Sequence, residues 1–148
     1  MALTKLNFSG QPTLPSSIFP TGSVIQTKIA TKVTAVNGQS ADFDTGLAVD
    51  ITPTSTSNKM FITCSASIYV GGTAQFWNQI FADGSLVTDL EMQMYFTSGV
   101  RRITTTNFIY TPTSTNSVNL KWRIKRASGT MNWSEDNQSM FMVQEIAG

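Results

Sequence analysis

The sequence lacks histidine and contains a single cysteine, Cys64. Histidine is the most frequent general base and the commonest nitrogen ligand for metals, so its absence removes the usual parts of a catalytic or metal site. One cysteine cannot form a disulfide within the chain. Cys64 falls on the apolar side of a strand-like run, where a thiol usually behaves as a small hydrophobic side chain. We therefore expect no catalytic residue, no metal site and no cofactor.

Charged residues are also scarce, at 13% of 148 residues, and the net charge is +1. Soluble domains usually carry about 25% charged residues, so this chain has no overall field that would attract nucleic acid or an anionic membrane. Its polarity comes from Ser, Thr, Asn and Gln. Such a surface is common where protein packs against protein or meets sugars, and plain solvated β-sheet explains it equally well.

Long apolar runs are missing, because none reaches the 18 residues of a membrane helix. The N-terminus also lacks the basic-then-apolar order of a signal peptide. We expect a soluble protein, made and folded in a reducing cytosol, with no membrane partner. Helical periodicity is absent over any useful length.

Strand signals fill the chain instead. The clearest lies in ITPTSTSNKMFITCSASIYV at 51–70, where apolar residues occupy every second position from Met60 to Val70. A turn, TPTSTS, precedes this run, and a similar turn, TPTSTNS at 111–117, precedes the alternating run VNLKWRIKR at 118–126. The β-branched run at 23–36 predicts a long first strand that ends in a turn at Asn37-Gly38, and Asp83-Gly84 is a typical hairpin turn. About eight or nine short strands without helices predict an all-β fold, an antiparallel β-sandwich or jelly roll.

Residues 1–22 form an extended N-terminal arm in this interpretation, before a single β-sandwich domain at 23–148. Pro12, Pro15 and Pro20 exclude a regular helix and disfavour a central strand. The arm is too apolar for a freely solvated tail, so we expect it to lie on its own domain, a neighbouring subunit or a larger assembly. The candidate anchoring residues are Leu3, Leu6, Phe8, Leu14, Ile18 and Phe19.

Three basic residues, Lys121, Arg123 and Lys125, share one face of the run at 118–126. They are candidate contacts for a polyanion. The alternative is that like charges protect an edge strand from aggregation. The near-neutral chain, and the lack of aromatic residues alternating with these charges, favour the edge strand and no nucleic-acid partner.

Three aromatic residues are candidate contacts for a glycan or a protein partner: Tyr69, Tyr95 and Trp133. Trp133 falls in an expected polar loop. There its indole would stack on a sugar, seal a subunit contact or cap the core.

Three segments, PTGSVIQ at 20–26, DTGLAVDITPTSTSNKMFI at 44–62 and MFMVQEIAG at 140–148, occur in an order that resembles a domain of tailed-bacteriophage structural proteins. That domain is often carried at the end of tail-fibre proteins of marine and cyanobacterial phages. The opening, MALTKLNFSGQPTLPS, also resembles short stand-alone virion proteins of such phages. Because the domain is nearly the whole sequence here, a small decorating or connecting part is favoured.

The resemblance implies a non-enzymatic virion protein, made in the host cytoplasm and assembled as a homotrimer of β-sandwiches. Its partners would be the major capsid or tail proteins, reached through the arm. The alternative is a tail-fibre-type module that recognises host surface glycans.

Overall fold

The computed structural model describes residues 19–32, 34–39, 41–70, 73–94, 100–134 and 139–148. These residues form ten strand segments and contain no helix, so none that could span a membrane. The strands are β1 (Val24–Lys32), β2 (Val36–Gln39), β3 (Phe43–Ile51), β4 (Lys59–Val70), β5 (Ala74–Ala82), β6 (Ser85–Met94), β7 (Val100–Tyr110), β8 (Val118–Ser128), β9 (Met131–Trp133) and β10 (Ser139–Ile146). The predicted all-β class is confirmed.

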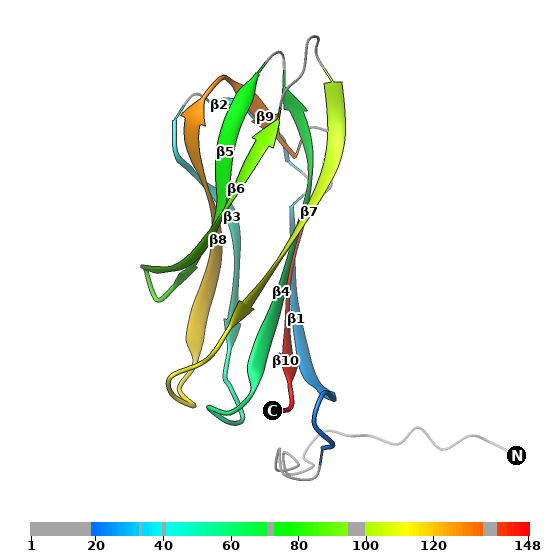
Figure 1. The fold of residues 1–148 in the computed structure, drawn as a ribbon, viewed down its shortest axis with the longest axis vertical. Coiled ribbons are helices and arrows are strands. Elements are labelled where there is room, and N and C mark those ends of the chain that lie inside the picture. The colour runs from blue at the N-terminus through cyan, green and yellow to red at the C-terminus, as the bar shows by residue number, and fades with distance from the viewer. Residues whose placement is uncertain (1–18, 33, 40, 71–72, 95–99, 135–138) are drawn as a thin grey trace, which may run out of the picture.

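The strands form two antiparallel sheets packed face to face (Figure 1). The first, which we call the β4 sheet, has the order β1-β10-β4-β7, and the short strands β9 and β2 extend it along the upper part of β4. The second, the β8 sheet, has the order β3-β8-β5-β6. The chain crosses between the sheets after β2, β3, β4, β6, β7 and β8, which, with these strand orders, is the topology of a jelly roll.

The core lies between the two sheets and follows the alternation of the sequence. On β4 the six inward residues from Met60 to Val70 are each at most 1% exposed, as the pattern predicts. Trp122 and Trp133 meet edge to face at 5.2 Å between ring centroids, which joins the two layers.

The first strand differs from the expectation. A single strand at 23–36 was predicted to end in a turn at Asn37-Gly38, but β1 stops at Lys32 and those two residues lie within β2. The cause is a change of partner: β1 pairs with β10, whereas β2 pairs with β9. Both partners lie along the same edge of β4, β10 opposite residues 59–66 and β9 opposite residues 68–70.

The hairpin predicted at Asp83-Gly84 is present between β5 and β6. The two residues have φ angles of 48° and 83°. Positive φ at both central positions is the requirement of a type I′ turn, which Asp-Gly meets at little cost.

A buried polar link also connects the layers. The side-chain oxygen of Asn78, on β5, accepts a hydrogen bond of 2.8 Å from the Trp122 indole, and its amide donates to the Thr106 hydroxyl of β7 at 3.1 Å. Asn78 is 1% exposed, so water cannot replace these bonds if they are lost.

We expect Asn78→Leu to lower the free energy of unfolding by about 1–3 kcal/mol, because it leaves the buried indole N–H without an acceptor. Urea denaturation followed by tryptophan fluorescence measures this. The matched control is Asn119→Leu, whose side-chain hydrogen bond to Asp50 is exposed and should matter little. Equal losses in the two variants would show that the link between the layers is unimportant.

Candidate functional site

A buried carboxylate, that of Glu145 on β10, collects hydrogen bonds from distant parts of the chain. One of its oxygens accepts from the backbone N–H of Thr54 at 2.7 Å, from the Thr54 hydroxyl at 2.8 Å and from the Asn58 amide at 2.7 Å. The other accepts from the Gln26 amide at 2.7 Å. Glu145 itself is 0% exposed. We call these four residues the clasp.

The clasp unites the three segments that carry the phage resemblance. Gln26 closes PTGSVIQ, Thr54 and Asn58 belong to the TPTSTSN turn, and Glu145 lies in the final QEIAG. The residues just before β1 and just after β10 reinforce it. The backbone N–H of Gly22 donates to Ala147, and that of Ala147 donates to Ser23, at 2.8 and 2.9 Å. The motif is therefore a structural unit at the base of the sandwich, where β1 begins and β10 ends (Figure 1).

The last residue fits this unit only as glycine. The backbone N–H of Gly148 donates to the Asn58 side chain at 3.1 Å. A Cβ on residue 148 would lie 2.1 Å from the carbonyl oxygen of Ser57, well inside contact distance. A side chain there would push the backbone at Ser57 away from residue 148 and so disturb the turn that supplies Thr54 to the clasp.

The clasp was not found from the sequence, although a signal for it exists. Phe141, Val143 and Glu145 share one side of the last strand, and a carboxylate on an apolar side needs partners to be buried. Burial alone would raise the pKa of Glu145, but the hydrogen bonds from Gln26, Asn58 and Thr54 outweigh it and hold that pKa below its usual value.

At pH 7 we expect Glu145→Gln to lower the free energy of unfolding by about 1–3 kcal/mol, because an amide cannot accept at both ends. A depressed folded-state pKa stabilises the protein above the unfolded value of about 4.3. That contribution is lost as the pH falls through the folded pKa. The difference between wild type and variant should therefore shrink on acidification, which urea denaturation at pH 7 and pH 3 measures.

The control for this experiment is Asp50→Asn, since Asp50 is exposed and accepts one exposed side-chain hydrogen bond, from Asn119. It should change stability by less than about 0.5 kcal/mol. An unchanged pH dependence in Glu145→Gln would contradict the role of the clasp.

Of the predicted arm residues, only Phe19 is described, and it is half-buried. Leu3, Leu6, Phe8, Leu14 and Ile18 lie outside the described residues.

The interpretation of Trp133 as a glycan contact is wrong. Its side chain is 0% exposed and packs against Phe43 and Trp122, with the Lys32 ammonium 5.7 Å from the ring centre. The expected loop is in part the strand β9, whose alternation turns Trp133 inward, so the indole caps the core. Tyr69 is half-buried on the outer side of β4, and Tyr95 lies outside the described residues.

The edge-strand explanation of the basic run is also wrong, because β8 lies between β3 and β5. Aromatic neighbours do exist. The Arg123 guanidinium lies 5.0 Å from the Phe81 ring centre, and the Lys125 ammonium lies 5.2 Å from that of Trp77. Both rings belong to β5, so alternation along β8 alone could not reveal them.

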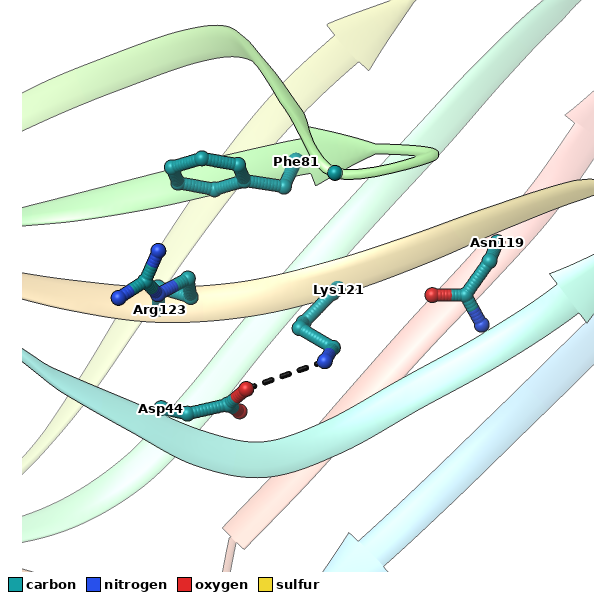
Figure 2. A pocket seen from close by; sticks show the side chains of 6 residues that line it. Asp44, Phe81, Asn119, Lys121 and Arg123 are labelled. Carbon is teal, nitrogen blue, oxygen red and sulfur yellow. Dashed lines mark ion pairs between the residues drawn. The ribbon is translucent and has the colours of Figure 1, made fainter.

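The same outer side of the β8 sheet is hollowed (Figure 2). The hollow has a volume of about 140 Å³ and is lined by Asp44, Phe81, Gly84, Asn119, Lys121 and Arg123.

Its charges are partly compensated, since the Lys121 ammonium is 3.1 Å from the Asp44 carboxylate. Partial burial would raise the pKa of Asp44, but the Gly46 N–H and Lys121 lower it below its usual value. This balance disfavours the polyanion interpretation.

No protein-family model matches the sequence, and no curated protein shows significant similarity to it. Solved structures with a related backbone include the infectious bursal disease virus Gx strain, at 13% identity and a TM-score of 0.46, covering 85% of this chain and 34% of that chain. The T13 particle of that virus has 9% identity and a TM-score of 0.44, and the match covers 84% of this chain and 36% of that chain. Dimeric latent PorU from Porphyromonas gingivalis has 11% identity and a TM-score of 0.41, and the match covers 82% of this chain and 13% of that chain. This chain thus spans little more than a third, or less, of each, and neither family nor function follows.

Proposed function

We propose that this chain is a non-enzymatic structural protein of a tailed-phage particle: a trimeric decoration, cement or short-fibre component anchored by its N-terminal arm. The ordered motif segments support this proposal. The jelly-roll topology agrees with it by analogy, because that architecture is frequent in viral capsid domains but serves other functions too.

The observation that carries the proposal is the clasp at the root of the arm. Gln26, near the start of β1, donates to Glu145, and Gly22 is hydrogen-bonded to the last strand's end. A clasp of charge-assisted hydrogen bonds, closed to water at Glu145, holds the chain where the arm begins. Such rigidity is unnecessary for a loose tail but suits a segment that transmits attachment to a particle.

The partner is inferred from the arm's chemistry. Within residues 1–18 only the side chain of Lys5 is ionisable, while leucine occurs three times and Phe8 and Ile18 add further apolar side chains. A segment of this kind gains most by lying on an apolar protein surface, which points to the major capsid or tail proteins.

We expect deletion of residues 1–18 to leave the sandwich folded, because every clasp residue is retained, and to abolish incorporation into particles. Circular dichroism and urea denaturation measure the fold, and the protein content of purified particles measures incorporation. A full-length control, Lys5→Ser, should still be incorporated because it keeps the apolar side chains. Incorporation of the truncated chain at wild-type level would overturn the anchoring role.

A host glycan is the second candidate ligand, and the hollow in Figure 2 favours it. Phe81 offers an aromatic ring, Asp44 offers hydrogen-bond acceptors, and Lys121 and Arg123 are donors at the same opening. Sugars combine apolar ring faces with hydroxyls that donate and accept, which matches this mixture better than a polyanion does.

If the hollow binds a glycan, Phe81→Ala should weaken binding at least about tenfold, the equivalent of 1.4 kcal/mol. A glycan array with the full chain identifies the ligand, and titration calorimetry measures the change. The control is Tyr69→Ala, which lies on the other sheet and should bind normally. Absence of binding across the array would reject this candidate and leave the structural role intact.

A further inference from the structure

The hollow in Figure 2 contains one cation without a polar partner. Its three charged side chains are those of Asp44, Lys121 and Arg123. The Lys121 ammonium is 3.1 Å from the Asp44 carboxylate, so these two charges compensate each other. The Arg123 guanidinium makes no hydrogen bond and no ion pair within the described part of the chain, and its contact is the Phe81 ring. The hollow therefore carries one uncompensated positive charge.

Arg123 is also held in position. Its guanidinium lies 5.0 Å from the centre of the Phe81 ring, and Figure 2 shows the two side by side while Lys121 turns toward Asp44. A half-buried arginine that rests on an aromatic ring has lost part of the rotamer freedom that binding would otherwise cost. Phe81 thus acts as a positioning residue that presents the guanidinium at the opening.

The chemistry of a guanidinium selects the group that it binds. It has several N–H donors in a planar fork and no acceptor, and this fork matches the two oxygens of a carboxylate through two parallel hydrogen bonds. The charge of the hollow agrees, because one carboxylate balances one uncompensated cation. A phosphate group carries about −1.5 to −2 charges at pH 7 and would leave excess negative charge beside Asp44.

The other walls of the hollow suit the rest of a sugar ring. The Asp44 carboxylate can accept hydrogen bonds from hydroxyl groups, and Phe81 offers apolar surface next to them. The volume of about 140 Å³ is that of about five water molecules. This space admits a single sugar residue and excludes a longer stretch of a glycan.

We propose that the hollow binds an acidic sugar, a residue with one carboxylate, and that the Arg123 guanidinium binds this carboxylate. The Lys121 ammonium neutralises Asp44, which would otherwise repel the ligand. The inference rests on glycan binding as the second candidate function and deepens it by naming the class of sugar.

Two other ligands explain less. A neutral sugar could fill the hollow, but it would bring no charge to balance the guanidinium of Arg123. A nucleic-acid strand presents a row of phosphates and needs a row of available cations, whereas Lys121, the neighbouring cation in the hollow, is already paired with Asp44.

The first measurement is a glycan array probed with the full chain. Each glycan that ends in a carboxylated sugar is matched by the same glycan with the neutral sugar and by a sulfated form. We expect the carboxylated member to bind at least about tenfold more tightly than the neutral one.

The array separates the possible failures. Equal binding of the acidic and neutral members would overturn this inference and leave glycan binding intact. Equally tight binding of the sulfated members would show that the site selects charge alone and would refute the carboxylate assignment. Silence across the array would reject glycan binding and the acidic sugar together.

The second measurement assigns the preference to Arg123. Titration calorimetry with one acidic glycan and its neutral partner should show that Arg123→Gln loses the preference, so that the two ligands bind equally. The control is Lys125→Gln, which removes the same charge from the next outward position of β8, outside the hollow, and should keep the preference. Circular dichroism confirms that both variants fold.

Two results of this titration would contradict the proposal. An undiminished preference in Arg123→Gln would show that the guanidinium does not bind the carboxylate. An equal loss in Lys125→Gln would show that the charge of the β8 sheet as a whole, and not the fork in the hollow, attracts the acidic sugar.

Discussion

The buried carboxylate of Glu145 is the constraint on which the base of this sandwich depends. An ionised group without contact with water is costly, and only its set of donors makes the burial tolerable. Those donors come from β1 and from the turn before β4, so the acid fixes both relative to β10. One side chain thereby ties the start of β1 and the turn before β4 to the end of β10.

Much of the fold could be predicted because a strand with one buried side alternates apolar and polar residues in the sequence. The runs at Met60–Val70 and Val118–Ile124 are buried as their period predicts, and Asp83-Gly84 makes the expected hairpin. The long first strand was not predicted correctly, since its interruption depends on where β10 ends and β9 begins along β4. Such a change of partner leaves no mark on the local sequence.

The candidate sites were harder to predict for the same reason. The pairing of Arg123 with Phe81 is a contact between neighbouring strands, and the clasp joins residues that are 119 positions apart. Trp133 shows the converse error, because a polar neighbourhood in sequence suggested exposure while three residues of strand were enough to turn it inward. The composition of a segment predicts whether its side chains are buried only where those side chains contact residues near them in the sequence.

The pairing of β1 with β10 has a consequence for the order of events during synthesis. Among the described strands, β1 has β10 as its only sheet neighbour, so the first strand finds its place only when the last has been made. Contacts over such separations form slowly, since the whole intervening chain must be brought together. A nascent chain therefore cannot fix the position of β1 before β10 has been made, however early β1 itself leaves the ribosome.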